Sequence, residues 1–480
     1  MTNKNNMLEQ LNRLEAESRQ LDRTPKEFAD WMDLLKEFGA GFLADIPREP
    51  VFFHGHNQPA LHQTIPVEAQ SLETALKEFG GKALPTGINT TSGRFFGYVP
   101  GGGLPSAAVG DFLAALTNRY SGVYQAGPGA AEIENITTRW LLKMVDYPKG
   151  AWGTLQSGGT LATLTAVIAA RETRPIEEWR KGVIYYSEEI HNAILKSIKI
   201  AGLSQAPARK IPTDSEFRMD AAALEAQIQQ DLADGLQPWI VFCSAGTVNT
   251  GAVDPLEAIS RICRRHSLWL HVDAAYGGFF MLTESGSWMK KWFAEADSLV
   301  LDPHKGLFLP YGCGAVLVKE GKWLREALSF HADYLADVQD LPSPSPSDYS
   351  PELTRHFRAM RLWLSLKVNG LNRFKAALEE KLLLAQYAYD RLRDMPEVEL
   401  GPEPQLSCVT FRLKADEAAP DAQTEALLET LLERGRVLLS STRLNGRVFL
   451  RICILCFRSH HEDVDVALEE ISRFISGQSD

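Results

Sequence analysis

The sequence has no apolar run approaching the roughly 18 residues that a membrane-spanning helix needs, so we expect no membrane association. No apolar core of a secretion signal follows its polar first residues, which favours a cytoplasmic protein. A surplus of basic residues is also missing, because 61 Asp and Glu outnumber 50 Lys and Arg and leave a formal net charge of −11. We therefore expect no nucleic-acid partner, since phosphate backbones are bound mainly by positive charge.

Cysteine is scarce, and the 480 residues include six: Cys243, Cys263, Cys313, Cys408, Cys453 and Cys456. Their wide spacing indicates reduced thiols rather than a disulfide framework. The last two have C-x-x-C spacing inside the apolar run RVFLRICILCF, where an odd offset places them on opposite faces of a strand. We expect both to pack in the core rather than to act in redox or metal chemistry. No metal site is expected elsewhere, since His54, His56 and His62 match no standard ligand spacing.

What the chain does contain is an ordinary globular composition, with 45% hydrophobic and 23% charged residues. At about 150 residues per domain, this length predicts two or three domains. Residues 7–38 carry apolar residues at helical spacing, and Thr24-Pro25 followed by Glu27 predicts the start of a second helix within them. Residues 85–110 are rich in Gly and Pro and indicate a loop.

Between about 150 and 320, short apolar runs alternate with helical patterns. The strand-like runs are GVIYYS (182–187), PWIVFCSA (238–245), LWLHVDAA (268–275), SLVLD (298–302) and GAVLVK (314–319). This alternation predicts an α/β sheet with crossover helices, and the continuous apolar character predicts helices on both faces.

The last third of the chain has a different pattern. Residues 341–351, LPSPSPSDYSP, predict a flexible loop or linker in which no core can form. A helical stretch follows at 353–394. The strand-like runs SCVTFRL and RVFLRICIL then flank one helical pattern and precede another, which predicts a small α+β domain.

Polar residues stand at the carboxyl ends of the predicted strands, the edge where open α/β sheets bind ligands. Lys305 follows SLVLD and is flanked by apolar residues; a lysine in a pocket can form a Schiff base with a carbonyl, whereas one at an exposed turn has no such role. Asp273 ends the apolar strand LWLHVDAA. A carboxylate there needs a partner, and the pyridinium nitrogen of a cofactor would serve, the alternative being an ordinary strand-end turn.

Three further strand ends carry candidate cofactor ligands. Ser157 and Gly158 precede the alanine-rich helix TLATLTAVIAAR, where backbone N–H groups and a hydroxyl would hold a phosphate or merely cap the helix. His191, in SEEIHNA, would place an imidazole against a planar ring, and Thr247, in CSAGTVNTG, ends the next strand. Taken singly, a histidine or threonine at such a position is usually structural.

Together these segments resemble the pyridoxal-phosphate enzymes of the aspartate-aminotransferase fold type. The resemblance is closer to the group II amino-acid decarboxylases, which include the aromatic-L-amino-acid, tyrosine, histidine and glutamate decarboxylases. The motifs that carry it are SGGTLATLTAVIAAR, SEEIHNA, HVDAAYGG and DPHKG, with FFGYVP, AGPGAAEIE and RHFRAMRLW in support. It extends from about residue 50 to the C-terminus.

The resemblance implies an α/β fold of type I with three parts: an N-terminal helical arm (1–85), a large cofactor-binding domain (86–365) with a mostly parallel sheet, and a small C-terminal α+β domain (366–480). It implies pyridoxal 5'-phosphate as cofactor and a homodimer with the active site at the interface. Lys305 would hold the cofactor as a Schiff base, Asp273 would pair with its ring nitrogen, and His191 would stack on the ring. Five further residues are expected around the cofactor: Ser157, Gly158, Thr247, Ala275 and His304.

The resemblance also implies residues that act on the substrate. Tyr334, in FHADYLADVQD, matches the tyrosine that decarboxylases use to protonate the carbanion, where related aldehyde synthases have phenylalanine. Four residues are expected at the substrate: Tyr98, Ser121, Val123 and Arg451. Arg451 would receive a carboxylate or, alternatively, form a structural ion pair. Gly306, where the animal enzymes have tryptophan, and the small Ser121 and Val123 leave the substrate open.

The expected function is therefore pyridoxal-phosphate-dependent decarboxylation of an L-amino acid, aromatic or related, to an amine and carbon dioxide. The alternatives are decarboxylation of an acidic amino acid, aminotransfer, oxidative deamination and C–C bond cleavage, because the fold alone does not select the reaction. A non-catalytic protein on this fold is disfavoured, since Lys305 and Asp273 are both retained.

Overall fold

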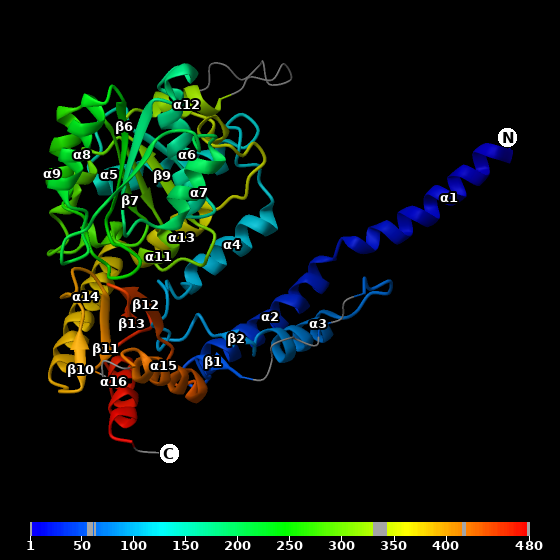
Figure 1. The fold of residues 1–480 in the computed structure, drawn as a ribbon. Helices are drawn as coiled ribbons and strands as arrows, with labels where there is room; N and C mark the ends of the chain where they lie inside the picture. The colour runs from blue at the N-terminus through cyan, green and yellow to red at the C-terminus, as the bar shows by residue number, and fades with distance from the viewer. Residues whose placement is uncertain (1, 55–60, 62–63, 330–342, 415–418, 478–480) are drawn as a thin grey trace. The chain divides into compact units, whose positions relative to one another are not determined.

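The computed structural model describes residues 2–54, 61, 64–329, 343–414 and 419–477 (Figure 1). The chain divides into two compact units, residues 1–89 and 90–480. Among the described helices, none combines the length and the apolar character needed to cross a bilayer.

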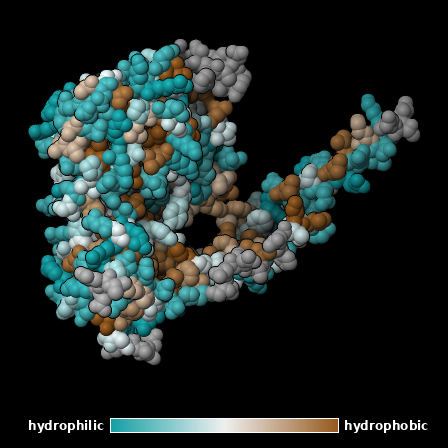
Figure 2. Space-filling view, viewed as in Figure 1, coloured by the Kyte–Doolittle hydropathy of each residue, from teal (hydrophilic) through white to brown (hydrophobic). Residues whose placement is uncertain are grey.

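The first unit is mainly helical. It contains α1 (Thr2–Ser18), α2 (Pro25–Asp45) and α3 (Leu72–Glu78), with a short antiparallel pair β1 (Phe52–Phe53) and β2 (Gly87–Ile88). The helix start at Thr24-Pro25 is confirmed, because the Thr24 hydroxyl accepts from the Glu27 N–H and the Glu27 carboxylate accepts from the Thr24 N–H. Apolar residues lie along the otherwise polar surfaces of α1 and α2 (Figure 2), among them Leu8, Leu11 and Leu14, each more than half exposed.

The second unit is built on a seven-stranded sheet with the order β3-β9-β8-β7-β6-β4-β5. Its strands are β3 (Trp152–Gln156), β4 (Gly182–Ser187), β5 (Ala208–Ile211), β6 (Gln237–Ser244), β7 (Trp269–Ala274), β8 (Ser298–Leu301) and β9 (Gly314–Val318). The run from β5 through β4, β6 and β7 to β8 is parallel, while β9 runs antiparallel to both β8 and β3.

Helices cover both faces of this sheet, as the continuous apolar strands predict. The helices of this part of the chain are α4 (Pro105–Thr117), α5 (Pro128–Val145), α6 (Gly159–Glu172), α7 (Asn192–Ile200), α8 (Ala221–Ala233), α9 (Leu256–Arg265), α10 (Met289–Phe293), α11 (Pro303–Gly306) and α12 (Gly321–Leu328). Residues of α5, α8 and α9 share one buried cluster with one face of the sheet, and residues of α6, α7 and α12 pack on the other face (Figure 1).

The C-terminal part holds a second, smaller sheet. Two helices, α13 (Ala359–Asn369) and α14 (Leu371–Arg393), meet at Gly370, whose φ of 70° ends the first helix. The antiparallel sheet has the order β10-β11-β13-β12, with β10 (Val398–Leu400), β11 (Cys408–Leu413), β12 (Ser440–Leu444) and β13 (Arg447–Cys453). Helices α15 (Ala422–Arg434) and α16 (His461–Ile475) pack on it.

The five strands expected between 182 and 319 are confirmed within one or two residues, whereas β1, β2, β3, β5, β10 and β12 were not predicted. The prediction of a flexible loop or linker at residues 341–351 is wrong for the described part of that segment. Pro346–Tyr349 forms a 3₁₀ helix with Pro346 buried, and the Ser345 hydroxyl accepts from the Tyr124 N–H at 3.0 Å. The described part of this segment is packed rather than an open linker, because serine hydroxyls satisfy backbone groups that burial would otherwise leave unpaired.

Candidate active site

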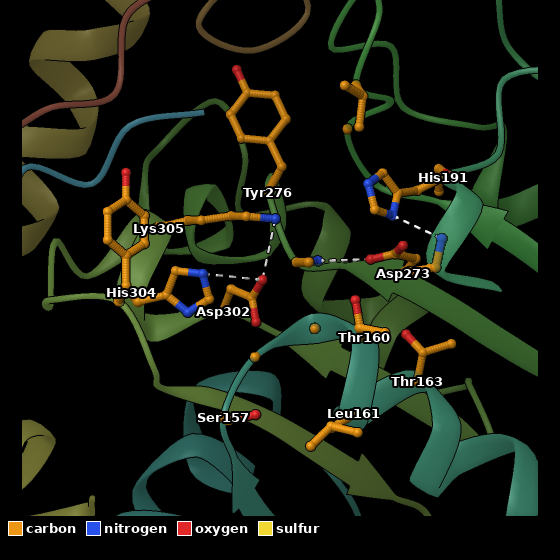
Figure 3. Close-up of a pocket in the computed structure, with 18 of the residues that line it drawn as sticks. Ser157, Thr160, Leu161, Thr163, His191, Asp273, Tyr276, Asp302, His304 and Lys305 are labelled. Carbon is orange, nitrogen blue, oxygen red and sulfur yellow. Dashed lines mark hydrogen bonds and ion pairs between the residues drawn. The ribbon is translucent and has the colours of Figure 1, made fainter. Parts of the chain in front are cut away.

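The carboxyl ends of the parallel strands and the N-terminus of α6 enclose a cavity of about 400 Å³ (Figure 3). This volume lies within the range of about 300–1,000 Å³ found for small-molecule sites. The predicted residues that line it are Ser157, Gly158, His191, Thr247, Asp273, Ala275, His304 and Lys305. Residues from five separate segments therefore meet at one edge of the sheet, as the strand-end rule predicts.

Lys305 reaches the cavity from α11, directly after β8. Its Nζ lies 3.1 Å from Oδ2 of Asp302, and Nε2 of His304 lies 3.7 Å from the same oxygen (Figure 3). Nδ1 of His304 donates to the carbonyl of Cys313 at 2.7 Å, which fixes the orientation of the ring. Gly306 has no room for a side chain, because a Cβ there would lie 2.8 Å from Cβ of Phe279.

Asp273 occupies the penultimate position of β7. Its Oδ1 accepts from the Ala275 N–H at 3.1 Å, which turns the carboxylate toward the cavity (Figure 3). Among the described residues, the second oxygen makes no hydrogen bond. A half-buried carboxylate with a free oxygen suits a cationic ring nitrogen as its partner.

The side of the cavity at the N-terminus of α6 is built from glycine and backbone. A Cβ on Gly159, the first residue of α6, would lie 2.9 Å from Oδ2 of Asp302, and one on Gly314 would lie 2.8 Å from its Oδ1. The Ser157 side chain is exposed to the cavity, and the first N–H groups of the 14-residue α6 point into it. This arrangement fits an anion, because helix N-termini bind phosphate through free N–H groups and a positive dipole end.

His191 and Thr247 lie on the wall contributed by β4 and β6. His191 caps α7, where its Nδ1 accepts from the Ala193 N–H at 3.1 Å and the ring faces the cavity (Figure 3). The hydroxyl of Thr247 lies 3.1 Å from that of Thr250 and accepts from the Ala252 N–H at 3.2 Å. The residues that follow β6 therefore form a tight turn that holds Thr247 in place.

Several predicted site residues lie elsewhere. None of Tyr98, Ser121, Val123 and Arg451 lines the cavity of its own chain. Ser121 and Val123 are buried, and the Ser121 hydroxyl donates to the carbonyl of Arg355 at 3.4 Å. Tyr98 is 61% exposed and has a positive φ of 54°. Tyr334 lies outside the described residues, and the roles of all five stay predictions.

Arg451 is buried on β13. It donates from Nε to the carbonyl of Asn249 at 3.0 Å, from Nη1 to the Ser440 hydroxyl at 2.8 Å and from Nη2 to the carbonyl of Tyr98 at 3.5 Å. Within the described part of the chain, no carboxylate pairs with it. The structural ion pair offered as one alternative is therefore not found there.

Several lining residues were not predicted, among them Asp302, Tyr276 and Tyr311. The sequence held a signal for Asp302, because this residue stands at the carboxyl end of the apolar run SLVLD, as Asp273 stands near that of LWLHVDAA. One of its oxygens, Oδ1, is buried without a hydrogen-bond partner among the described atoms. Burial raises the pKa of both tyrosines, so both hydroxyls remain protonated near neutral pH.

Comparison with known proteins decides the family. The profile described as the pyridoxal-dependent decarboxylase conserved domain matches residues 55–414, three quarters of the chain. The chain belongs to the pyridoxal-dependent decarboxylases. The decarboxylase is 34% identical over 377 residues to an aromatic-L-amino-acid decarboxylase of Bacillus atrophaeus, covering 77% of this chain and 78% of that one. It is 29% identical to tyrosine decarboxylase 4 of Petroselinum crispum, covering 90% and 89%.

The fold agrees with this assignment. The decarboxylase superposes with a TM-score of 0.89 on the structure described as Oryza sativa TDC with PLP and tryptamine, at 23% identity and with 95% and 99% of the two chains covered. The predicted family, fold class and pyridoxal-phosphate cofactor are thus confirmed, as is the carboxy-lyase reaction on an L-amino acid. The glycine-walled cradle, the free Asp273 oxygen and the cavity lysine fit that cofactor's phosphate, ring nitrogen and aldehyde.

Proposed function

We propose that the decarboxylase acts on an aromatic L-amino acid, with Lys305, Asp273 and His191 as its central catalytic residues. The observation that carries the assignment of roles is the arrangement of these three side chains around one cavity, each coming from a different strand end. Lys305 supplies the amine that binds the cofactor's aldehyde. Ser157, Gly158 and the α6 N-terminus hold its phosphate, with His304 beside them.

Pyridoxal phosphate, when bound, supplies an electron sink for the pair left behind by the departing carboxylate. The chain supports that chemistry through charge and orientation. Asp273 keeps the ring nitrogen protonated, because a carboxylate stabilises the cation beside it. His191 holds the substrate against the ring, and Tyr334 returns a proton to the α-carbon. Tyr276, which is buried, and Tyr311, which is exposed, form part of the cavity wall.

The character of the cavity lining favours an aromatic side chain. An acidic substrate side chain needs a cation, yet Lys305 is the only lysine or arginine among the described lining residues and it pairs with Asp302. A basic side chain needs a free carboxylate, but Asp302 faces Lys305 and Asp273 faces the cofactor ring. The two tyrosines of the lining instead offer aromatic surface, on which rings stack favourably.

The test is anaerobic incubation of the purified holoenzyme with single aromatic, acidic and basic L-amino acids, with products read by mass spectrometry. We expect an amine and carbon dioxide from an aromatic substrate. Amine from an acidic or basic member alone would overturn the substrate assignment. Keto acid or aldehyde in place of amine would overturn the proposed role of Tyr334 as the residue that returns a proton to the α-carbon. The products of Tyr334→Phe would then be compared with those of the unsubstituted chain.

We also propose that two copies associate as a homodimer that shares the active site. The supporting surface is an apolar stripe on α4, where Val109, Phe112 and Leu116 recur at helical spacing and are 39–52% exposed. Ser121 and Val123 lie outside the cavity of their own chain, which is consistent with a role at the partner's site. Leu116→Glu should shift sedimentation toward the monomer, whereas Leu232→Glu, a similarly exposed leucine on α8, should not.

Two further predictions remain part of this proposal. We place the protein in the cytoplasm, in keeping with six free cysteines. We divide it at 85/86 and 365/366; the second boundary lies within α13, between the last strand of the large sheet and the first strand of the small one. Limited proteolysis should cut near 85/86 before it cuts within either sheet.

A further inference from the structure

The small antiparallel sheet brings two cysteines together that are far apart in sequence. Cys408 begins β11 and Cys453 ends β13, and the two are register partners across adjacent strands. Both are buried and both are free. The neighbour of Cys453 in C-x-x-C spacing, Cys456, lies beyond the strand, where its Sγ packs against Gly102. The fold therefore gives Cys453 a different partner from the one that its spacing suggests.

The hydrogen bonds around the pair define its geometry. The Ile454 N–H donates to the carbonyl of Ser407 at 2.7 Å, and the Cys453 N–H donates away from β11 to the carbonyl of Phe96 at 2.9 Å. Cys408 and Cys453 thus form a non-hydrogen-bonded antiparallel pair, in which opposite Cα atoms are only about 4.5 Å apart and side chains approach most closely. That separation lies at the near end of the range of about 4.4–6.8 Å between Cα atoms bridged by a disulfide.

The charges around the pair distinguish its two thiols. Arg451 lies two residues before Cys453 on the same face of β13, and the Sγ of Cys408 lies 4.0 Å from the Asn249 carbonyl to which Arg451 donates. A hydrogen bond from the Cys453 thiol and the charge of Arg451 lower the pKa of Cys408 to about 7. Cys453, facing that thiolate, has its pKa raised.

The other cysteines lack this activation. Burial raises the pKa of each of the remaining four: Cys243, Cys263, Cys313 and Cys456. Tyr276, which also faces the pair, stays protonated because burial raises its pKa. Cys408 is therefore the one cysteine with both a lowered pKa and a partner thiol directly opposite it.

We propose that Cys408 and Cys453 are a redox-active pair, oxidised by hydrogen peroxide to a disulfide that links β11 to β13. Cys408 acts as the attacking thiolate and Cys453 as the resolving thiol. Nothing in this proposal depends on which amino acid the enzyme decarboxylates.

The chemistry balances in two steps. The Cys408 thiolate attacks one peroxide oxygen, the O–O bond breaks, and after proton transfer Cys408 carries a sulfenic acid while water leaves. The sulfur of Cys453 then attacks the Cys408 sulfur, the S–O bond breaks and a second water leaves. Two thiols lose two electrons and two protons, and one peroxide is reduced to two waters. Peroxide is small enough to reach a buried thiolate through local opening of the structure.

The pair lies next to the wall of the active site. Ser407, one residue before Cys408, donates from its N–H to the hydroxyl of Tyr276 at 3.1 Å, and the two side-chain hydroxyls lie 2.9 Å apart. Tyr276 lines the cavity, as do Thr247 and Val248 ahead of Asn249. The redox state of the pair is thus positioned to alter the environment of the cavity wall.

The test uses the unsubstituted holoenzyme treated with stepwise hydrogen peroxide at pH 7, alkylated, digested without reduction and mapped by mass spectrometry. We expect a peptide that joins Cys408 to Cys453, lighter by two hydrogens than its reduced parts and restored by dithiothreitol. We also expect Cys408 to be lost about ten-fold faster than the other thiols, because its pKa is lowered and Cys453 lies directly opposite it. Unfolding the protein first should abolish that preference.

Three variants separate the roles of the thiols. Cys453→Ser should leave Cys408 as a sulfenic acid that dimedone traps, and Cys408→Ser should leave Cys453 reduced over the same exposure. Cys456→Ser is the matched control and should not change the cross-link. Far-ultraviolet circular dichroism and cofactor absorbance report whether each variant is folded.

Each remaining outcome contradicts the proposal. A cross-link between Cys453 and Cys456 would assign redox activity to the C-x-x-C spacing instead. Oxidation of all six thiols at similar rates would show that the setting of Cys408 confers no reactivity. Persistence of both Cys408 and Cys453 as thiols, at peroxide levels that convert exposed methionines to sulfoxide, would show that the pair is inert.

Discussion

The two sheets of residues 90–480 present their reactive side chains in different ways. In the large, mostly parallel sheet, Lys305, Asp273 and His191 lie at or just after strand ends and line a cavity, where a ligand can reach them. In the small antiparallel sheet, Cys408, Cys453 and Arg451 lie within or at the margins of strands and are buried on one face, so each meets only protein. The direction of the strands explains the difference, because parallel strands send all their carboxyl ends to one edge and antiparallel strands do not.

The two sheets also differ in how they stabilise a buried charged side chain. Asp302 is kept beside Lys305 and His304 at the cavity edge, whereas Arg451 relies on two carbonyls and a hydroxyl inside the protein. At the cavity edge, Lys305 can exchange Asp302 for a ligand as its partner. Arg451 contributes mainly to the contact between the two sheets, because its donors are already occupied by the loop after β6, by β12 and by the segment at Tyr98.

The sharpest contrast is expected from removing the cavity lysine. Lys305→Ala should lower decarboxylation at least about a thousand-fold, because no other lysine lines the described cavity to bind the cofactor covalently. Borohydride should fix pyridoxal phosphate to the unsubstituted chain and not to the variant, as read by intact mass. Lys196→Ala, on the exposed face of α7, is the control and should keep full activity. Retained covalent cofactor in Lys305→Ala would refute the assignment.

A second test concerns Asp254, a fully buried carboxylate that supports the edge of the large sheet. Its two oxygens accept from the N–H groups of Met219 and Ser244, each at 2.7 Å, and burial raises its pKa to about 6. A raised folded-state pKa contributes stability that is complete below the unfolded-state pKa of 3.8 and is lost as pH rises toward 6. That loss amounts to about 3 kcal/mol.

Asp254→Asn removes the titration. The free energy of unfolding of the unsubstituted protein should therefore fall relative to that of the variant between pH 4 and pH 7, as measured by urea titration at each pH. A difference that does not change with pH would mean that the carboxylate is charged without penalty. The variant itself should be less stable throughout, because an amide accepts one of the two N–H groups well and opposes the other.

The smallest effect is expected in the antiparallel sheet. Arg451→Met keeps the length of the side chain but leaves the carbonyl of Asn249 and the Ser440 hydroxyl without this donor. The free energy of unfolding should fall by about 1–3 kcal/mol. Arg443→Met, an exposed arginine on the neighbouring β12, should change it by less than about 0.5 kcal/mol. Equal losses of unfolding free energy in the two variants would show that the buried hydrogen bonds of Arg451 stabilise the protein no more than the exposed Arg443 does.

Much of the large sheet and its site follows from local sequence. The strands at 182–187 and 298–302 are continuous apolar runs, and Asp273 and Lys305 come just where such runs end. These residues can be placed together without knowing the strand register. It is enough that strands joined by crossover helices run parallel and so end at the same edge of the sheet. Strands β5 and β12 were not predicted, because their burial alternates with exposure and their sequences, ARKI and SSTRL, have little apolar character. The packing of Ser345 and Pro346 was not predicted, because it depends on segments more than 200 residues away.

The sequence by itself determined the family and the cofactor, through the resemblance that its short motifs carry. It also determined the edge at which the chemistry takes place, because polar residues stand at the ends of the apolar runs. Only the tertiary structure placed Asp302 beside Lys305, kept Ser121 and Val123 out of their own cavity, and set Cys408 opposite Cys453. Each of these depends on how distant segments pair or pack. A shift of one residue in the pairing of β11 with β13 would place the two thiols on opposite faces of the sheet.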